Sequence, residues 1–433
     1  MRLKKAIENQ YIYSVFTKLL VVSIGFANSV IIARYFGPNI KGITATVLNY
    51  SNIFAILLTF GLHEAYPYFL KKSKDKENFK SIYMTNIMFL YLMYSLICLI
   101  IILLNHHNTI VIMCAITSFF HGYSMIANYV ALVENPNKRN TIVLLINLFD
   151  LLILIYFYLF IPVNTVIACI FSMSLFVLES FIFTIFVKPK FSWKQIQFSY
   201  LFKLFKFGFF PMIALLLTTL NYRIDIIMLK SMSISYSLIG IYSIGVSLAE
   251  KVFLIPTAVK EVLLSKLSKG KDANEVIKVI KVCYPICLII SFFILLFGKI
   301  FINIFYGLDF SSSYEITVIS VFGTVFMIFF KMISTYYIIN GKQVLTVKML
   351  SVSVIINIIL NYVLIPKYKI IGAAMASDVS YFICAILFIY SFKKDQNIKF
   401  KDLLFLNKKE INNILNRFKK NNFLLKEEKK NEK

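Results

Sequence analysis

Twelve long apolar stretches, each ended by a turn or a charge, run through this chain from Tyr11 to Phe392. A stretch of about 20 apolar residues rises roughly 30 Å as a helix, which matches the hydrocarbon core of a bilayer. Only a helix or a closed barrel satisfies its backbone hydrogen bonds there, and barrel strands are shorter and alternate apolar with polar residues. Residues 97–104 are apolar all round. The sequence therefore predicts an all-α, polytopic membrane protein with 12 transmembrane helices. The predicted spans are residues 11–33, 42–63, 82–104, 109–133, 141–161, 165–187, 207–229, 238–259, 282–302, 316–339, 344–365 and 370–392.

The predicted spans divide six and six around residues 188–206, which hold five lysines and Trp193. Because six is even, both halves enter the membrane in the same direction, as in transporters built from parallel repeats. We expect an N-terminal six-helix bundle at residues 1–187 and a C-terminal six-helix bundle at residues 207–392, joined by a cytoplasmic linker. Residues 393–433 form a basic tail whose apolar residues recur at helical spacing, which predicts an amphipathic helix at the membrane interface.

A weak internal echo supports two related halves. Ile31-Ile32-Ala33 and a short polar link precede Gly42, and Ile226-Ile227-Met228 and a short polar link precede Gly240. Another span follows each glycine. The echo is suggestive and does not by itself establish a repeat.

The net charge of +25 is distributed loop by loop. The N-terminus and the connections on its side carry 23 Lys and Arg residues, and the tail adds 13. The opposite connections carry six: Arg34, Lys41, Lys230, Lys299, Lys367 and Lys369. The positive-inside rule therefore predicts both termini in the cytoplasm. A nucleic-acid partner is not expected, because such a partner requires the charge on one folded face.

No pattern for an enzyme, a cofactor or a metal is found. All six cysteines lie inside or at the edge of apolar spans, where they act as small hydrophobic residues. His63 and His121 are single, and His106 and His107 occupy a short turn, so no metal-ligand set is formed. The sequence also lacks a nucleophile triad and a phosphate-binding glycine loop.

Ionisable side chains inside the spans are the candidates for function, because each costs at least about 2.5–3.5 kcal/mol near mid-membrane. They are Asp150 and Glu179 in the first half, and Arg223, Asp225, Glu250, Lys251, Lys331 and Asp378 in the second. Asn147 lies one turn before Asp150 on the same helix face. Pairing across helices to fix the packing is an equally strong interpretation for any one of them.

The cations in the second half favour an anionic substrate over a drug. A dry drug-binding cavity has no use for Arg223, Lys251 and Lys331, so we expect these three to bind substrate. Arg34, at the outward end of the first span, is either a further substrate-binding residue or an interface anchor. For ion coupling the candidates are Asp150, Glu179, Asp225 and Asp378.

Several short motifs resemble those of the Wzx-type polysaccharide exporters, also called O-antigen flippases. Residues 34–42, Arg-Tyr-Phe-Gly-Pro-Asn-Ile-Lys-Gly, are similar to the R-x-x-G-P-x-x-x-G link after the first span of that family. The family lies within the MATE-like (MOP) superfamily, which also holds multidrug MATE exporters and MurJ lipid flippases. Further similar blocks reach to about residue 392: Phe60-Gly61-Leu62, Asp225 with Gly240-Ile241-Tyr242, Ile255-Pro256, residues 305–310, residues 357–366 and Gly372-Ala373-Ala374.

The resemblance implies a flippase and not an enzyme. Such a protein lies in the bacterial inner (cytoplasmic) membrane and moves an undecaprenyl-diphosphate-linked oligosaccharide unit from the cytoplasmic to the periplasmic leaflet by alternating access. The unit serves O-antigen, lipopolysaccharide, capsule or other surface polysaccharide biosynthesis. Implied partners are this lipid-linked substrate, membrane lipids, a coupling proton or sodium ion, and polysaccharide assembly proteins.

Two alternatives stay open. A MATE-like multidrug or cation antiporter is favoured by carboxylates such as Asp150 and disfavoured by the buried cations. A membrane-embedded polysaccharide polymerase needs a sizeable extramembrane region, whereas the longest outward connection, around Gly307, has little more than about ten residues.

Overall fold

The computed structural model describes residues 2–161, 165–268 and 273–404, and every regular element in these ranges is a helix. The first half contains α1 (Arg2–Thr59), α2 (Leu62–Lys72), α3 (Lys76–Leu104), α4 (Thr109–Glu134), α5 (Pro136–Phe160), α6 (Thr165–Val187) and the 3-10 helix η1 (Trp193–Gln195). The second half contains α7 (Phe198–Ser231), α8 (Tyr236–Ala249), η2 (Glu250–Phe253), α9 (Leu254–Ser268), α10 (Ala273–Phe305), η3 (Leu308–Phe310), α11 (Ser313–Ile339), α12 (Gln343–Gln396) and α13 (Phe400–Leu404).

Two of these helices are long enough to cross a membrane twice. Helix α1 has 58 residues and is broken at Gly37, whose φ of 73° is a left-handed conformation that glycine adopts at little cost. Helix α12 has 54 residues and is broken at Lys369, with φ 51°. When the two parts of each are counted separately and α8, η2 and α9 count as one, the described residues contain twelve crossings. The all-α fold and the twelve predicted spans are confirmed.

Several helices extend beyond the predicted spans because hydropathy detects only the part inside the hydrocarbon. Helix α3 begins at Lys76, with the Asp75 side chain accepting a hydrogen bond from the Asn78 amide (3.1 Å) as an N-cap. Helix α2 was not predicted. It begins after Phe60 and Gly61, which have φ values of 46° and 68°, so the second span ends at Thr59 and not at residue 63.

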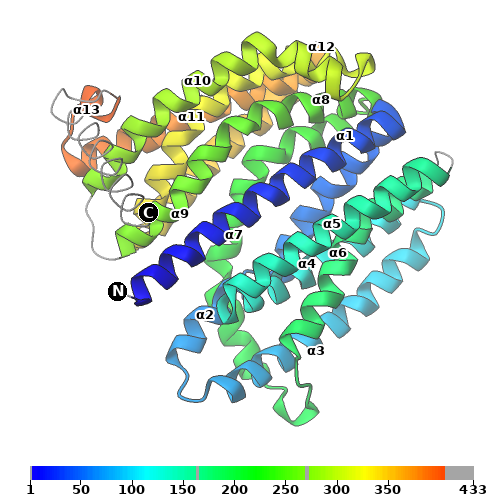
Figure 1. Ribbon diagram of the computed structural model, residues 1–433, viewed down its shortest axis with the longest axis vertical. Coiled ribbons are helices and arrows are strands. Elements are labelled where there is room, and N and C mark those ends of the chain that lie inside the picture. Colours follow the sequence, from blue (N-terminus) through cyan, green and yellow to red (C-terminus); the bar gives the residue numbers. More distant parts are fainter. Residues whose placement is uncertain (1, 162–164, 269–272, 405–433) are drawn as a thin grey trace, which may run out of the picture.

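The helices run along one common direction, and the N-terminus, α2, α9 and α13 lie at the same end (Figure 1). We call this the basic end, because the lysine-rich residues 71–80, 188–206 and 260–268 belong to it. Helices α1 and α3 to α6 pack mainly on one another, and α10, α11, α12 and α7 form a second packed group. Contacts between the groups come mainly from α1 with α7 and α8 and from α2 with α7. The division into two bundles at residues 188–206 stays a prediction that this packing supports.

Backbone touches backbone where the two groups meet. A Cβ built on Gly42 would lie 1.7 Å from the Tyr236 carbonyl oxygen, and one on Gly240 would lie 2.0 Å from that of Pro38. These are the two glycines of the internal echo. At the basic end, a Cβ on Gly208 would lie 2.2 Å from the carbonyl oxygen of Phe60. Only glycine allows approaches this close.

The predicted tail is described only in part. Residues 393–396 continue α12, and α13 follows after Asn397 in a left-handed conformation (φ 50°). Leu403 of α13 is buried against the core of the second half. Residues 405–433, which include most of the predicted interfacial helix, lie outside the described residues.

Candidate functional site

Five of the eight predicted site residues, Asp150, Glu179, Arg223, Lys251 and Lys331, fall into two clusters on different helices. We call Asp150 and Glu179 the acidic pair; they lie on α5 and α6. We call Arg223, Glu250, Lys251, Lys260 and Lys331 the cationic cluster; they come from α7, η2, α9 and α11.

Asp150 is buried and accepts hydrogen bonds from two other helices. Ser174 Oγ of α6 donates to Oδ1 (2.8 Å), and Asn28 Nδ2 of α1 donates to Oδ2 (3.4 Å). Asn147, expected beside Asp150, donates instead to the Val143 carbonyl oxygen of its own helix (2.8 Å). The polar partners of Asp150 are therefore contributed by tertiary packing and not by its own helix.

Glu179 lies close enough to Asp150 for their charges to interact, and Ser124 of α4, whose hydroxyl donates to the His121 carbonyl oxygen (2.9 Å), lies near it. Arg139, which sequence analysis assigned to a loop, also acts on Glu179. Its guanidinium donates to Asn128 Oδ1 (2.6 Å) and Asn140 Oδ1 (3.0 Å). Two neighbouring carboxyl groups with limited access to water favour binding of a proton or a small cation between them.

The cationic cluster is organised around a break between α8 and α9. The 3-10 helix η2 interrupts the apolar span and contains Glu250 and Lys251. Glu250 pairs with Arg223 of α7, with 2.9 Å between Oε2 and Nη2. Because Arg223 donates across to another helix, its positive charge is already partly balanced. A 3-10 segment within a long helix often marks a hinge or a functional site.

Lys331 differs from Arg223 in its surroundings. Its ammonium lies 4.3 Å from the ring centroid of Phe253 and 5.5 Å from that of Tyr222. Among the described residues no carboxylate is within ion-pair distance of Lys331. Lys260 of α9 adds a second positive charge that acts on it. The Lys331 side therefore carries an excess of positive charge over aromatic faces, which suits an anion.

Asp225 and Asp378, the other two predicted carboxylates of the second half, accept hydrogen bonds from protein groups. Asp225, only 2% exposed, accepts hydrogen bonds from the Tyr242 hydroxyl, from Ser377 Oγ (3.1 Å) and from the Ile226 amide (2.7 Å). Asp378 accepts one from the Gly323 amide. These contacts give both side chains a packing role irrespective of any ion.

Arg34 binds the end of a helix. Its Nε donates to the carbonyl oxygen of Phe305 (2.7 Å), and Nη2 donates to that of Ile304. These carbonyls end α10, where no intrahelical donor remains and where a cation is favoured by the helix dipole. The contact joins α1 to α10 at the end opposite the basic end. Of the two roles left open for Arg34, the geometry favours the anchor.

Lys260 and Glu64 are not among the site residues predicted from the sequence. Lys260 was assigned to a loop that begins at residue 260, whereas α9 continues to Ser268. Glu64 lies in the unpredicted helix α2, and Lys260 is close enough for their charges to attract. The pair links the first half to the second at the basic end. A helical continuation of the span beyond residue 259 would have placed Lys260 within α9, nearly two turns after its start at Leu254.

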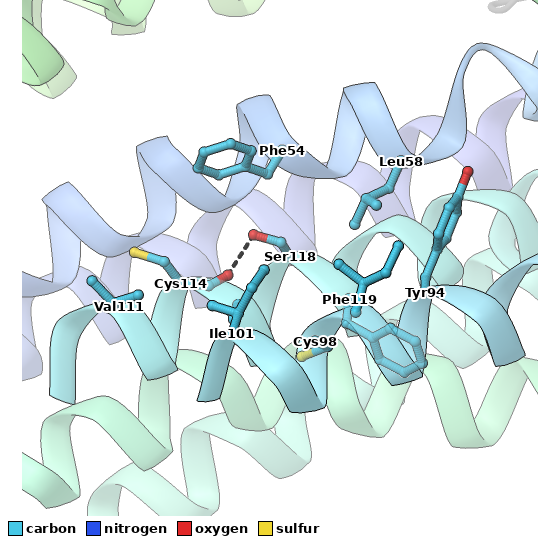
Figure 2. A pocket seen from close by; sticks show the side chains of 11 residues that line it. Phe54, Leu58, Tyr94, Cys98, Ile101, Val111, Cys114, Ser118 and Phe119 are labelled. Atoms are coloured by element: carbon cyan, nitrogen blue, oxygen red, sulfur yellow. Dashed lines mark hydrogen bonds between the residues drawn. The ribbon is translucent and has the colours of Figure 1, made fainter. Parts of the chain in front are cut away.

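One groove among the described residues lies away from these charges. A groove of about 230 Å³ between α1, α3 and α4 opens among apolar side chains (Figure 2). Its lining consists of Phe54, Leu58, Tyr94, Ile97, Cys98, Ile101, Val111, Cys114, Ala115, Ser118 and Phe119. The Ser118 hydroxyl donates a hydrogen bond to the Cys114 carbonyl oxygen of its own helix. Such a lining suits hydrocarbon and not sugar.

The sequence profile of a family described as "Polysaccharide biosynthesis protein" matches residues 9–263, more than half of the 433-residue chain. The chain belongs to this family. The match includes the acidic pair and the Arg223–Glu250 ion pair, whereas Lys331 and Asp378 lie beyond it.

A curated relative, the capsular polysaccharide biosynthesis protein CapF of Staphylococcus aureus, is 27% identical over 188 residues, which is 41% of this chain and 46% of that protein. The match thus spans less than half of the relative. An inward-facing multidrug resistance MATE transporter of the MOP superfamily superimposes with a TM-score of 0.71 at 12% identity, covering 89% of this chain and 98% of the other. The lipid II flippase MurJ superimposes with 0.65 at 16% identity, covering 90% and 89%. The fold is therefore that of the MATE-like superfamily, as the resemblance of the motifs implied.

Proposed function

We propose that this membrane protein is a flippase. It translocates an undecaprenyl-diphosphate-linked oligosaccharide unit from the cytoplasmic to the periplasmic leaflet of the inner membrane by alternating access. The unit is used for O-antigen, capsule or another surface polysaccharide, in association with polysaccharide assembly proteins. Membership of the polysaccharide biosynthesis family supports the pathway. In this proposal the basic end and both termini face the cytoplasm.

The observation that carries the proposal is the environment of Lys331. An ammonium held over the rings of Phe253 and Tyr222, with no carboxylate of the described residues within ion-pair distance, needs another anion to offset its removal from water. A diphosphate offers several charge-assisted acceptors, and its attraction to a cation is stronger in a low-dielectric site than in water. Lys260 of α9 acts on Lys331 as a further positive charge, and η2 contributes Lys251 to the same cluster.

Arg223 has a second role in this proposal. Its guanidinium is held by Glu250, so its remaining donors are oriented before the substrate arrives. A planar fork can contact two phosphate oxygens at once, which a lysine cannot. Arg34 is not required for the headgroup, because its donors already bind the end of α10.

The acidic pair is the proposed coupling site for a proton or a sodium ion. An ion gradient can bias the transport cycle only through a group whose ion binding differs between its states. Asp150 receives hydrogen bonds from α1 and α6, so a movement of α1 against α6 would change its coordination. Asp225 ranks below it, because three protein donors already hold its oxygens in a site that is only 2% exposed. Asp378 ranks below it as well, because its hydrogen bond comes from α11 within the second half and does not respond to a movement of α1 against α6.

A MATE-like antiporter of organic cations is the second candidate, and the acidic pair favours it. The flippase and the antiporter differ in the effect that the positive charge of Lys331 has on the bound substrate. A positive charge at the substrate site raises the energy of a bound organic cation and lowers that of a bound diphosphate.

The deciding experiment replaces Lys331 with Gln in the full chain, expressed in cells whose surface glycan depends on it. We expect glycan display to be lost and the lipid-linked unit to accumulate in the cytoplasmic leaflet, with normal protein levels. Lys367→Gln, a matched change at an exposed position of α12, should leave display intact. If Lys331→Gln also supports normal display, the cationic cluster does not bind the substrate. Efflux of an organic cation that depends on Asp150 would then identify an antiporter.

A further inference from the structure

The segment between the two halves, residues 188–197, is hydrogen-bonded to α3. Asn86 Nδ2 donates to the Gln195 carbonyl oxygen (3.2 Å), and Asn86 Oδ1 accepts a hydrogen bond from the Gln197 amide (3.0 Å). Ser81 Oγ donates to Gln195 Oε1 (2.7 Å), so the side chain of Gln195 in η1 is held as well as its backbone. These bonds fix residues 190–197 against the basic end of α3. These hydrogen bonds therefore also set the orientation of the exposed side chains of residues 190–197.

The fastened segment directs large aromatic side chains outward. Phe191, Trp193, Phe198 and Phe202 are 39%, 67%, 71% and 71% exposed. Phe191 and Trp193 support each other edge to face, with 4.9 Å between ring centroids. Fully hydrated aromatic surface of this extent is unfavourable, so a partner with apolar surface is expected to cover it.

This aromatic surface is continuous with the lipid-facing surface of α7. Phe198 and Phe202 lie one turn apart on one face of the helix, and Phe209, 45% exposed, continues that face into the membrane-spanning part. A soluble protein partner would have to end where the bilayer begins. A membrane surface covers the whole stripe without interruption, and aromatic side chains favour the headgroup level.

The same segment is strongly basic. Residues 188–206 contain no Asp or Glu and five lysines, all exposed: Lys188, Lys190, Lys194, Lys203 and Lys206. None of their ammonium groups is within ion-pair distance of a carboxylate of the described residues. Lysines beside interfacial aromatic residues attract anionic headgroups, while their aliphatic stems lie along apolar surface.

We propose that residues 188–206 form a binding surface for anionic lipid headgroups, with Trp193 inserted at headgroup level and Lys188, Lys190 and Lys194 around it. The surface is separate from the cationic cluster and does not depend on the transported substrate. Because the segment is bonded to α3 and continues directly into α7, a bound lipid layer restrains both halves at the basic end. The lipids that it selects are those with a net negative headgroup, such as phosphatidylglycerol.

Trp193 is the one tryptophan of the chain, so its fluorescence reports on this surface alone. The full-length protein is reconstituted in phosphatidylcholine vesicles that contain an equal mole fraction of acyl-brominated phosphatidylglycerol or acyl-brominated phosphatidylcholine. Bromine quenches only a nearby indole. We expect stronger quenching by the anionic lipid, corresponding to about fivefold enrichment around Trp193, and a smaller excess at high salt.

Two charge variants separate this surface from general attraction to a basic protein. Replacing Lys188, Lys190 and Lys194 with Gln should abolish the excess quenching. Replacing Lys71, Lys72 and Lys74, on a neighbouring connection of the same end, should leave most of it. Equal quenching by the two lipids in the unmodified protein would contradict anionic selectivity. Quenching by aqueous iodide together with protection from both bromolipids would overturn membrane docking and would leave the face to a soluble partner.

Discussion

The contact of α1 with α8 at Gly42 and Gly240 offers a sharp test of alternating access. If the substrate path opens at the end opposite the basic end, these two helices have to separate there. In the present structure they touch backbone to backbone, and a Cβ on Gly240 would lie 2.0 Å from the Pro38 carbonyl oxygen. Gly240→Ala therefore cannot be accommodated unless the helices move apart, because ordinary Cβ contacts begin near 3.4 Å.

The size of the effect follows from the cost of overpacking. Adding a methyl group to a tight contact costs about 1–3 kcal/mol, here only in the state in which α1 and α8 touch. The separated state does not bear this cost. Since about 1.4 kcal/mol is a factor of ten, the ratio of separated to closed protein should rise by roughly fivefold to a hundredfold.

Thiol labelling measures that ratio. Ile43 of α1 is buried in a small apolar cluster on which Tyr236 of α8 packs. In a background without native cysteines, Ile43→Cys should react faster with an impermeant reagent when Gly240→Ala is added. Gly25→Ala is the matched control, because a Cβ at Gly25 meets nothing within 4 Å and brings the same gain in helix propensity. Equal labelling rates in the two folded variants would refute the idea that this crossing opens.

Two further predictions concern coupling and topology. Asp150→Asn should keep the hydrogen bond from Ser174 but remove the dependence of transport on the proton or sodium gradient, measured in vesicles with imposed gradients; unchanged dependence would exclude Asp150 as the coupling group. Cysteine at Asn108, the cap of α4, should react with an impermeant reagent from the periplasmic side, and cysteine at Ser73 should not, whereas the opposite pattern would invert the proposed topology.

The number and order of the spans could be predicted because the hydrocarbon core imposes a strong and local pattern on the sequence. Residues 165–187 were predicted as a span, and α6 covers Thr165–Val187. The breaks at Gly37 and Lys369 also lie between predicted spans. Helix α2 was missed because it has only 11 residues and begins at two left-handed residues that hydropathy does not reveal.

The charged residues could be named from the sequence, but their partners could not. Arg34 binds carbonyl oxygens about 270 positions away, and Arg223 pairs with Glu250 on a different helix. Which residues face each other depends on the rotation and register of packed helices, which a single sequence does not specify. For the same reason, backbone carbonyl oxygens such as those that bind Arg34 could not be identified as partners from the sequence. Among the described residues Arg223 has a carboxylate partner and Lys331 has none within ion-pair distance, and this distinction emerged only from the packing.

The second glycine crossing predicts a perturbation of opposite sign. Gly208 of α7 lies against the backbone of Phe60 and Gly61 at the basic end, where a Cβ would be 2.2 Å from the Phe60 carbonyl oxygen. If the two ends open alternately, Gly208→Ala favours opening at the basic end and so favours closure of α1 on α8. Labelling of Ile43→Cys should then fall below that of the parent protein. Because the two penalties act on opposite sides of one equilibrium, adding Gly240→Ala should restore labelling toward the parent rate. Unchanged labelling in Gly208→Ala alone would mean that the basic-end crossing is a fixed contact around which the other end moves.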